Sequence, residues 1–158
     1  ELAPIVLGAL RGNMLTLSAE NAGGAHPYFT PPAHTAWARG ILGEKALLCP
    51  EQMLLLETDA NRARTIARAH MATYTGLDNY RNNLRQFGFE DADFAAGGSD
   101  RLVDAIFAWG DEQALRQRIQ AHWDAGANHV CIQTFTDEVQ RGPNLALLEL
   151  LAPLNTPV

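Results

Sequence analysis

The sequence has few basic residues and no long hydrophobic segment. Lys45 is the only lysine among 158 residues, and the formal net charge at pH 7 is −6. Nucleic-acid-binding surfaces need clustered Lys and Arg side chains, so this composition argues against a nucleic-acid partner. No apolar run reaches the length of a membrane-spanning helix, and no signal peptide is visible. We therefore expect a cytoplasmic protein that has no membrane partner.

Cysteine is also scarce. Cys49 and Cys131 are isolated from one another in apolar surroundings. We interpret them as reduced thiols of the core, while a disulfide between them remains an alternative. We expect no metal site, because the spacing of His26, His34 and Cys49 follows no zinc pattern and no further ligand completes a set.

What the chain does contain is a regular alternation of short apolar runs and helical patterns. Hydrophobic residues make up 47% of the sequence, enough for the core of one domain over residues 1–158. The apolar runs predict four strands, near residues 4–9, 24–29, 52–58 and 129–134. Strands that alternate with helices indicate an α/β fold with a parallel sheet.

Right-handed crossovers would place each helix on the outer face of a curving sheet. Four strand–helix units are half of a (β/α)₈ TIM barrel, which needs roughly 250 residues. An open doubly wound sheet is the competing architecture, but the turn Gly8-Ala9-Leu10-Arg11-Gly12 is not the dinucleotide-binding fingerprint.

The middle of the chain differs from the rest. Residues 76–98 are rich in Asn, Arg, Asp and aromatic side chains, and we expect short helices inserted before the last strand. Ser99 or Asp100 is expected to cap a helix that continues through Trp109. Earlier in the chain, Thr30 is expected to cap the helix that begins at Pro31-Pro32.

The end of the first strand is a candidate binding site. Gly8, Ala9 and Gly12 lack the bulk that keeps a ligand away from the backbone. A helix that begins near Asn13 would direct free N–H groups and the positive end of its dipole toward this point. A plain strand–loop–helix turn explains the same residues without a ligand.

Several stretches together resemble the luciferase-like oxidoreductases, in particular the branch that uses the deazaflavin coenzyme F420. The stretches that carry the resemblance are Pro4 to Leu10 with Met14-Leu15, Gly24 to Tyr28, Pro50-Glu51-Gln52, Leu56 to Asp59, Asn79 to Leu84, Gly97 to Asp104, Ala108-Trp109-Gly110 and His129 to Gln133.

The resemblance implies that the chain is the C-terminal half of the barrel and that the N-terminal half is missing from it. In agreement, the sequence opens on a strand without an initiator Met, and we expect it to be a piece of a longer protein. The resemblance also implies hydride transfer between F420 and a small organic substrate, with FMN as the alternative cofactor of a monooxygenase. We expect the fragment alone to be inactive.

By position, the resemblance assigns the cofactor's phosphate-bearing chain to the first strand end. The residues there are Gly8, Ala9, Leu10, Arg11, Gly12 and Asn13, and Arg11 could meet a phosphate in bidentate fashion.

Other candidates come from the remaining strand ends. His26 and Tyr28 close the second strand and are catalytic candidates, although a histidine bound to neighbouring backbone is an equal alternative. Candidates for the substrate pocket or its lid are Glu57, Asn79, Tyr80, Arg81 and Gln133. Tyr80 and Arg81 have a structural alternative, namely holding the insertion against the barrel.

A second hypothesis is a non-catalytic half-barrel that binds a partner chain through its open sheet edges. In either case the uncovered edges predict self-association into a homo-oligomer, or pairing with the N-terminal half of the same barrel.

Overall fold

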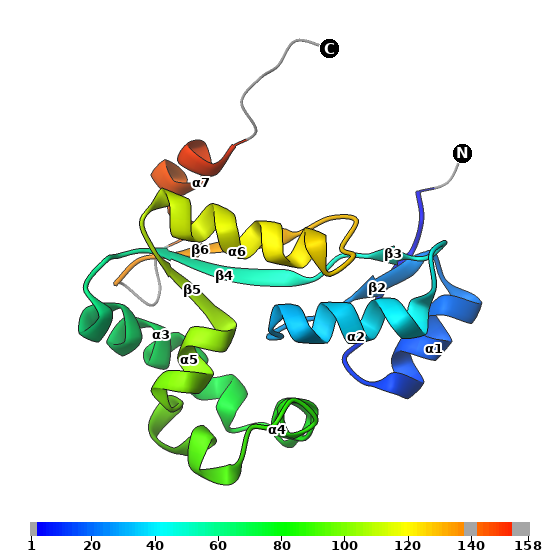
Figure 1. The fold of residues 1–158 in the computed structure, drawn as a ribbon, viewed down its shortest axis with the longest axis horizontal. Coiled ribbons are helices and arrows are strands. Elements are labelled where there is room, and N and C mark those ends of the chain that lie inside the picture. Colours follow the sequence, from blue (N-terminus) through cyan, green and yellow to red (C-terminus); the bar gives the residue numbers. More distant parts are fainter. Residues whose placement is uncertain (1–2, 138–141, 153–158) are drawn as a thin grey trace.

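The computed structural model describes residues 3–137 and 142–152, which form short parallel strands and helices (Figure 1). The first three strands form one sheet in the order β1-β2-β3. They are β1 (Val6–Gly8), β2 (Gly24–His26) and β3 (Leu47–Leu48). The other three form a sheet in the order β5-β4-β6. They are β4 (Glu51–Leu56), β5 (Phe107–Gly110) and β6 (Cys131–Phe135).

The two sheets are continuous, because β3 runs into β4 through Cys49 and Pro50. The Cys49 N–H donates to the carbonyl of Ala25, and the Glu51 N–H donates to that of Pro27, both at 2.9 Å. On the other side, the Cys131 N–H donates to the Pro50 carbonyl at 2.9 Å. The predicted order of four parallel strands is thus confirmed, whereas the described residues form no closed barrel.

Four of the helices begin where the sequence supplies a capping side chain. The helices are α1 (Gly12–Asn21), α2 (Pro32–Leu42), α3 (Ala60–Thr75), α4 (Asp78–Arg85), the 3₁₀ helix η1 (Asp91–Gly97), α5 (Asp100–Ile106), α6 (Glu112–Asp124) and α7 (Leu145–Leu151). Side-chain oxygens accept backbone N–H bonds at the starts of α3, α5, α6 and α7, from Asp59, Ser99, Asp111 and Asn144. The short helices expected within residues 76–98 are α4 and η1.

Helices cover both faces of β4, which corrects the expectation that all of them lie on one side. Met53 and Leu55 pack with residues of α3 and α5. Leu54 lies between them in sequence, and it packs with Leu115 of α6 and Leu147 of α7. Successive side chains of a strand point to opposite faces, so β4 has an α3 face and an α6 face. Figure 1 shows α6 and α7 on one side of β4 and α3 and α5 on the other.

Two local predictions were wrong. The helix expected to continue through Trp109 ends at Ile106, and Phe107 begins strand β5, which pairs with Met53 of β4. A short apolar run can be helix or strand, and backbone pairing with a distant strand decides this one. Thr30 is not a cap either: Pro31 is the N-cap of α2, and the Thr30 hydroxyl has no hydrogen-bond partner in the described part of the chain.

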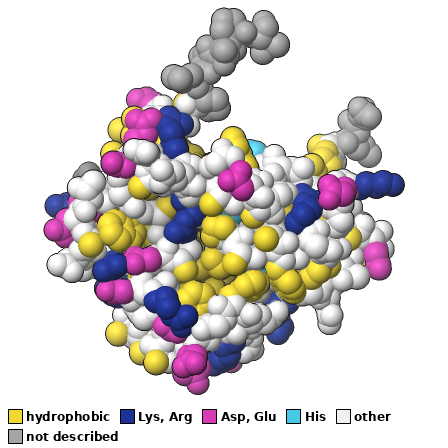
Figure 2. All heavy atoms as spheres, viewed as in Figure 1, with side chains coloured by type: hydrophobic (Ala, Val, Ile, Leu, Met, Phe, Trp, Pro, Cys, Tyr) yellow, Lys and Arg dark blue, Asp and Glu magenta, His cyan; other side chains and the backbone are white. Residues whose placement is uncertain are grey.

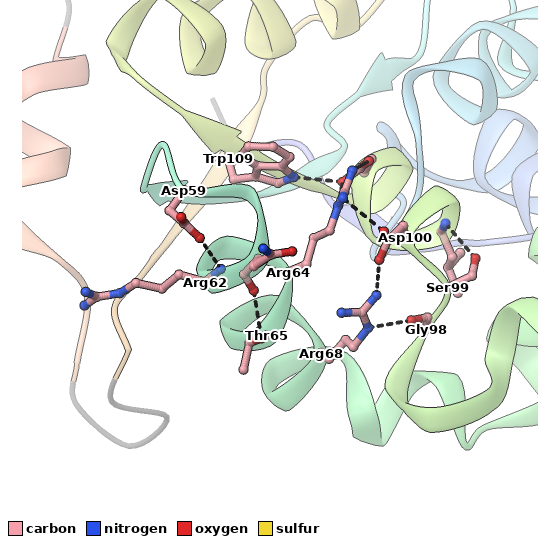
Figure 3. Close-up of polar contacts among 12 residues, drawn as sticks. Asp59, Arg62, Arg64, Thr65, Arg68, Gly98, Ser99, Asp100 and Trp109 are labelled. Atoms are coloured by element: carbon pink, nitrogen blue, oxygen red, sulfur yellow. Dashed lines mark hydrogen bonds and ion pairs between the residues drawn. The ribbon is translucent and has the colours of Figure 1, made fainter.

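An arginine cluster joins α3 to α5 and β5 (Figure 3). Arg64 donates to Asp104 at 2.6 Å and to Asp100 at 3.0 Å, and Arg68 also bonds to Asp100. The indole N–H of Trp109 donates to Asp104 at 2.9 Å. Several of these side chains are exposed, so we attribute the position of α3 mainly to the apolar contacts beneath them.

The surface carries both charge signs. On the face of the described chain that Figure 2 shows, Lys and Arg side chains are scattered among Asp and Glu side chains, around a central band of hydrophobic side chains. In the same part of the chain, no helix has the length and apolar content needed to cross a bilayer.

Candidate functional site

The end of β2 and the middle of β6 bring three of the predicted site residues, His26, Tyr28 and Gln133, together on the α3 face. Ala25 packs with Leu48 on the opposite face, so the alternation of strand side chains directs His26 and Tyr28 toward the α3 face. The hydroxyl of Tyr28 donates to Oε1 of Gln133 at 3.0 Å. The rings of His26 and Tyr28 meet edge-on, with centroids 6.5 Å apart.

Tyr74 of α3, which the sequence analysis did not single out, completes this cluster. Its hydroxyl lies 3.0 Å from that of Tyr28. Burial, the hydrogen bond with Tyr74 and the nearby Glu51 raise the pKa of Tyr28 far above its usual value. Tyr28 is therefore a protonated phenol that is already bound to Gln133 and Tyr74, and it is a poor proton acceptor.

His26 is bound to the neighbouring strand. Its Nδ1 lies 2.6 Å from the backbone carbonyl of Cys49. A carbonyl oxygen only accepts, so Nδ1 is the donor of this bond, and in the neutral ring Nε2 is the acceptor nitrogen. The ring is only partly buried. The backbone contact is the one expected of a structural histidine, yet it also fixes the tautomer that leaves Nε2 free to accept a proton.

Glu51 is a site residue that the sequence analysis missed. It is 2% exposed, and its Oε2 accepts the backbone N–H of Phe29 at 3.2 Å. Burial raises the pKa of Glu51 to about 8, despite the opposing effect of the bond from Phe29. The only signal was the place of Glu51 at the start of an apolar run, where a carboxylate has no obvious reason to be.

Phe29 has an unusual backbone conformation for a bulky residue, with φ at 58°. It is fully buried and packs against two aromatic rings. The ring of Tyr74 stacks on it at 4.9 Å, and the ring of Tyr80 meets it edge-on at 5.5 Å. Strained residues of this kind persist only where the surroundings hold them, and they occur often at functional sites.

The turn between β1 and α1 is open where the cofactor's phosphate chain was predicted to bind. A Cβ added to Gly8 would meet nothing within 4 Å. Exposed Arg11 is the N-cap of α1 and makes no side-chain capping bond, and the helix begins at Gly12. The carbonyl of Leu10 accepts a bond of 2.7 Å from Nε2 of His34. The turn thus combines open space with an uncapped helix N-terminus formed by Gly12 and Asn13.

Three other predicted residues lie apart from the Tyr28 cluster. Glu57 pairs with Arg62 at 3.0 Å and accepts the Asp59 N–H at 3.0 Å, so it belongs to the start of α3. Asn79 is exposed. Arg81 donates to the Thr75 carbonyl at 2.5 Å and lies over the Phe94 ring, which is the structural role of joining α4 to its neighbours.

The two cysteines are free thiols and only partly buried, although core positions were expected. Burial raises the pKa of both thiols, which keeps them protonated at neutral pH. Within the described ranges, no group of three or more His, Cys, Asp or Glu side chains is arranged as a metal site.

No family model matches the sequence, and no curated protein matches it. Solved structures do match this chain. An F420-dependent secondary alcohol dehydrogenase, solved with an F420-acetone adduct, aligns with 84% of this chain at a TM-score of 0.58 and 11% identity. The coenzyme F420-dependent tetrahydromethanopterin reductase of Methanopyrus kandleri aligns with 81% at a TM-score of 0.54 and 18% identity.

The chain spans 43% and 44% of the lengths of these two proteins. At such low identity the match concerns the fold. It confirms the structural resemblance to F420-dependent luciferase-like enzymes that the sequence motifs indicated: the chain has the fold of part of these proteins.

Proposed function

We propose that this chain is the cofactor-binding part of an F420-dependent oxidoreductase that acts on a small organic substrate. The observation that carries the proposal is the open β1–α1 turn, in a fold that both F420-dependent neighbours share over more than four fifths of this chain. F420, when bound, would supply the hydride chemistry. The residues of this chain would hold the cofactor and manage the proton that accompanies the hydride.

The turn fits the phosphate-bearing chain of such a cofactor. Gly8 leaves the approach to the backbone open, and the first N–H groups of α1 are free of a side-chain cap. Backbone N–H groups at a helix N-terminus favour an anion. The exposed guanidinium of Arg11 stands beside them and adds a positive charge.

Of the two catalytic candidates, His26 is the better proton acceptor. Its Nδ1 proton is directed to the Cys49 carbonyl, so Nε2 can take the proton of a substrate hydroxyl as hydride leaves the carbon. The Tyr28 hydroxyl is held by Gln133 and Tyr74, so it orients the side chains around His26 instead.

The remaining part of the barrel is the partner that this proposal requires. β1 is an edge strand, and the apolar side chains around it are exposed: Ile5 by 70%, Val6 by 37%, Met14 by 42% and Leu17 by 43%. Such an edge pairs readily with another strand. We propose the N-terminal half of the same barrel as its partner, and a homo-oligomer for the complete protein.

Those exposed residues also favour the second candidate function, a non-catalytic half-barrel that binds a partner chain. Fluorescence titration of the protein with F420, and separately with FMN, distinguishes the candidates. Micromolar binding of F420 supports the proposal, and preference for FMN indicates the monooxygenase alternative. Binding of neither cofactor, also after addition of the N-terminal half, leaves the partner-binding function.

Gly8→Val tests the site within that titration. A Cβ there meets no protein atom within 4 Å, and the branched side chain of Val would obstruct a phosphate; loss of one charge-assisted bond weakens binding about tenfold. Gly40→Val is the matched control, because a Cβ at Gly40 also has open space. Unchanged affinity in a folded Gly8→Val protein contradicts the assignment of this turn.

A further inference from the structure

Arg118 of α6 is a partly buried cation, and none of the ion pairs among the described residues includes it. Its guanidinium donates to two backbone carbonyls instead, to that of Ala105 at 2.8 Å and to that of Asp104 at 2.6 Å. Both carbonyls belong to the last turn of α5, so Arg118 caps that helix. The carbonyls fix the guanidinium in place, but they carry only partial negative charges and do not neutralise it.

The acidic side chain closest to Arg118 in the fold is bound elsewhere. Asp104 accepts two bonds from Arg64, at 3.0 Å and 2.6 Å, and one from the indole N–H of Trp109 at 2.9 Å (Figure 3). Burial lowers the pKa of Arg118, and the charge of Asp104 opposes that shift without reversing it. An arginine nevertheless stays protonated. Buried charges are normally paired, so this one can accept a further anionic partner.

The guanidinium borders a pocket of about 440 Å³ between β5 and α6. This volume lies in the range of small-molecule sites. Much of the remaining wall is apolar and consists of Phe107, Ala108, Trp109, Ala114 and Ala121. Apolar walls around a single cation match an organic anion better than an inorganic one.

Trp109 is the aromatic wall of this pocket. Its bond to Asp104 and the guanidinium of Arg64, 5.5 Å from the ring centroid, fix the orientation of the indole. On the opposite wall, Ala114 and Ala121 lie four residues before and three residues after Arg118, on one side of α6. Their small side chains leave room for a ring beside the guanidinium, and an aromatic ring there can pack against Trp109.

The pocket offers one free positive charge. The charge of Arg64 is shared between Asp104 and Asp100. A dianion such as a phosphate would therefore bring one negative charge too many next to Asp104. A carboxylate brings a single charge, and its planar shape matches the fork of N–H groups of a guanidinium.

We propose that the pocket between β5 and α6 binds a monoanionic aromatic carboxylate, with the carboxylate on Arg118 and the ring against Trp109. None of the lining residues belongs to the β1–α1 turn or to the Tyr28 cluster. The pocket is therefore an additional small-molecule site, and the proposal does not depend on the proposed function.

Binding at Arg118 should be visible at His122, one turn further along α6. Burial, and then the charges of Arg118 and His34, lower the pKa of His122 to about 4. A carboxylate on Arg118 offsets part of that positive charge, so the pKa of His122 should rise when the pocket is filled. NMR titration of the histidine ring protons, with and without ligand, measures the shift.

Calorimetric titration with benzoate tests the site itself. Benzamide has the same ring without the charge, and phenylphosphonate carries up to two charges. One benzoate should bind per chain, and benzamide should bind about tenfold more weakly, because it lacks the charge-assisted bonds.

Arg118→Gln removes the charge and should weaken benzoate binding about tenfold or more. Arg116→Gln is the matched control: Arg116 lies on the same helix and also donates to a backbone carbonyl, that of Leu150, but it does not line the pocket. Benzoate affinity should stay within about twofold in the control. Ala121→Leu keeps Arg118 and its cap of α5, and should prevent binding by filling the pocket. Thermal unfolding shows that each variant is folded.

Loss of benzoate binding in Arg118→Gln and Ala121→Leu, but not in Arg116→Gln, together with a raised pKa of His122, supports the site. Absence of saturable benzoate binding to the wild type at millimolar concentrations overturns the proposal, and so does wild-type affinity in folded Ala121→Leu. Equal affinity for benzamide, or tighter binding of phenylphosphonate, contradicts recognition of a single charge. The F420 titration of Gly8→Val is unaffected by any of these results, so the two proposals fail separately.

Discussion

Two buried histidines, His34 and His122, lie in junctions of α2 that differ in how completely their polar atoms are paired. His122 of α6 accepts a bond from the Thr35 hydroxyl at 2.8 Å and donates to Oε1 of Gln52 at 2.9 Å. The amide of Gln52 in turn donates to the carbonyls of Met53 and Ile106, each at 2.8 Å. His34 makes one bond, to the Leu10 carbonyl, and its other ring nitrogen has no partner among the described residues.

This difference in pairing means that the polar atoms of the two junctions have different effects on the stability of the folded protein. A buried network in which every atom is paired is rigid and contributes to stability, as in the junction of α2 with α6. A buried set with unpaired atoms destabilises the ligand-free protein and provides hydrogen bonds for a ligand. His122 is therefore a structural residue, whereas His34 leaves one ring nitrogen without a partner among the described residues.

The largest expected effect is that of Glu51→Gln on the pH dependence of stability. The pKa of Glu51 is about 8 in the folded protein and has an ordinary value near 4.5, so the folded state holds a proton that the unfolded state releases. Stability from this group is complete below pH 4.5 and is lost as the pH rises to 8. Over that window the wild type should lose about 3–5 kcal/mol relative to Glu51→Gln.

Urea denaturation of both proteins at pH 5, 6, 7 and 8 measures this difference. The comparison isolates Glu51, because His34 and His122 titrate in both proteins. A constant difference across the four pH values would show that Glu51 ionises normally in the folded protein. The charge of Glu51 also acts on Tyr28, Tyr80 and Cys131. The pKa of each of these groups is raised, so none of them titrates in this window.

His122→Leu should have the next largest effect. The substitution leaves the buried Thr35 hydroxyl and Gln52 amide oxygen without a partner, so we expect a loss of about 3 kcal/mol in the free energy of unfolding. His34→Leu removes one bond and also one unpaired nitrogen, and should cost clearly less. Chemical denaturation at pH 7 compares the two variants. Equal losses would mean that the junctions do not differ in pairing.

The sequence predicted the four parallel strands because each is a short apolar run between turn signals. β5 was missed because Phe107-Ala108-Trp109 continues an apolar helical pattern, and only its pairing with β4 makes it a strand. The placement of α3 and α5 was missed for a similar reason. Met53 and Leu55 are as apolar as Leu54, so local pattern could not show which helix would cover which face.

At the site, strand ends could be predicted but partners could not. His26 and Tyr28 were found because they lie at and just after the end of a parallel strand, whereas Gln133, predicted to end its strand, lies in the middle of β6. Tyr74 and Glu51 lie in a helix and at a strand start, and only three-dimensional contact relates them to Tyr28. Apart from the place of Glu51 at the start of an apolar run, the buried residues with unpaired atoms, Thr30, His34 and Asn83, have no sequence signal, because the absence of a partner is a property of packing alone.

One substitution made at two positions of the same segment sharpens the comparison at a smaller scale. Thr35→Val deprives Nδ1 of His122 of its donor and should destabilise the protein by about 1–2 kcal/mol. Thr30→Val removes a buried hydroxyl that has no partner and should stabilise the ligand-free protein by about 1 kcal/mol. Thermal unfolding in the same buffer compares their signs. If both substitutions destabilise the protein, the Thr30 hydroxyl has a hydrogen-bond partner that the structure does not show.

The smallest expected effect extends the comparison to the β1–α1 turn, where the Leu10 carbonyl accepts the bond from His34. Asp59 caps α3, whereas Arg11 leaves α1 uncapped. Arg11→Ser introduces a hydroxyl that can accept an N–H of the first turn, and should stabilise the ligand-free protein by about 0.5–1 kcal/mol relative to Arg11→Ala.

The same hydroxyl competes with a phosphate for these N–H groups. FMN should therefore bind Arg11→Ser more weakly than Arg11→Ala, which lacks the guanidinium but keeps the N–H groups free. Equal affinities of the two variants, both below that of the wild type, would show that the guanidinium alone binds the phosphate and that the open helix N-terminus takes no part.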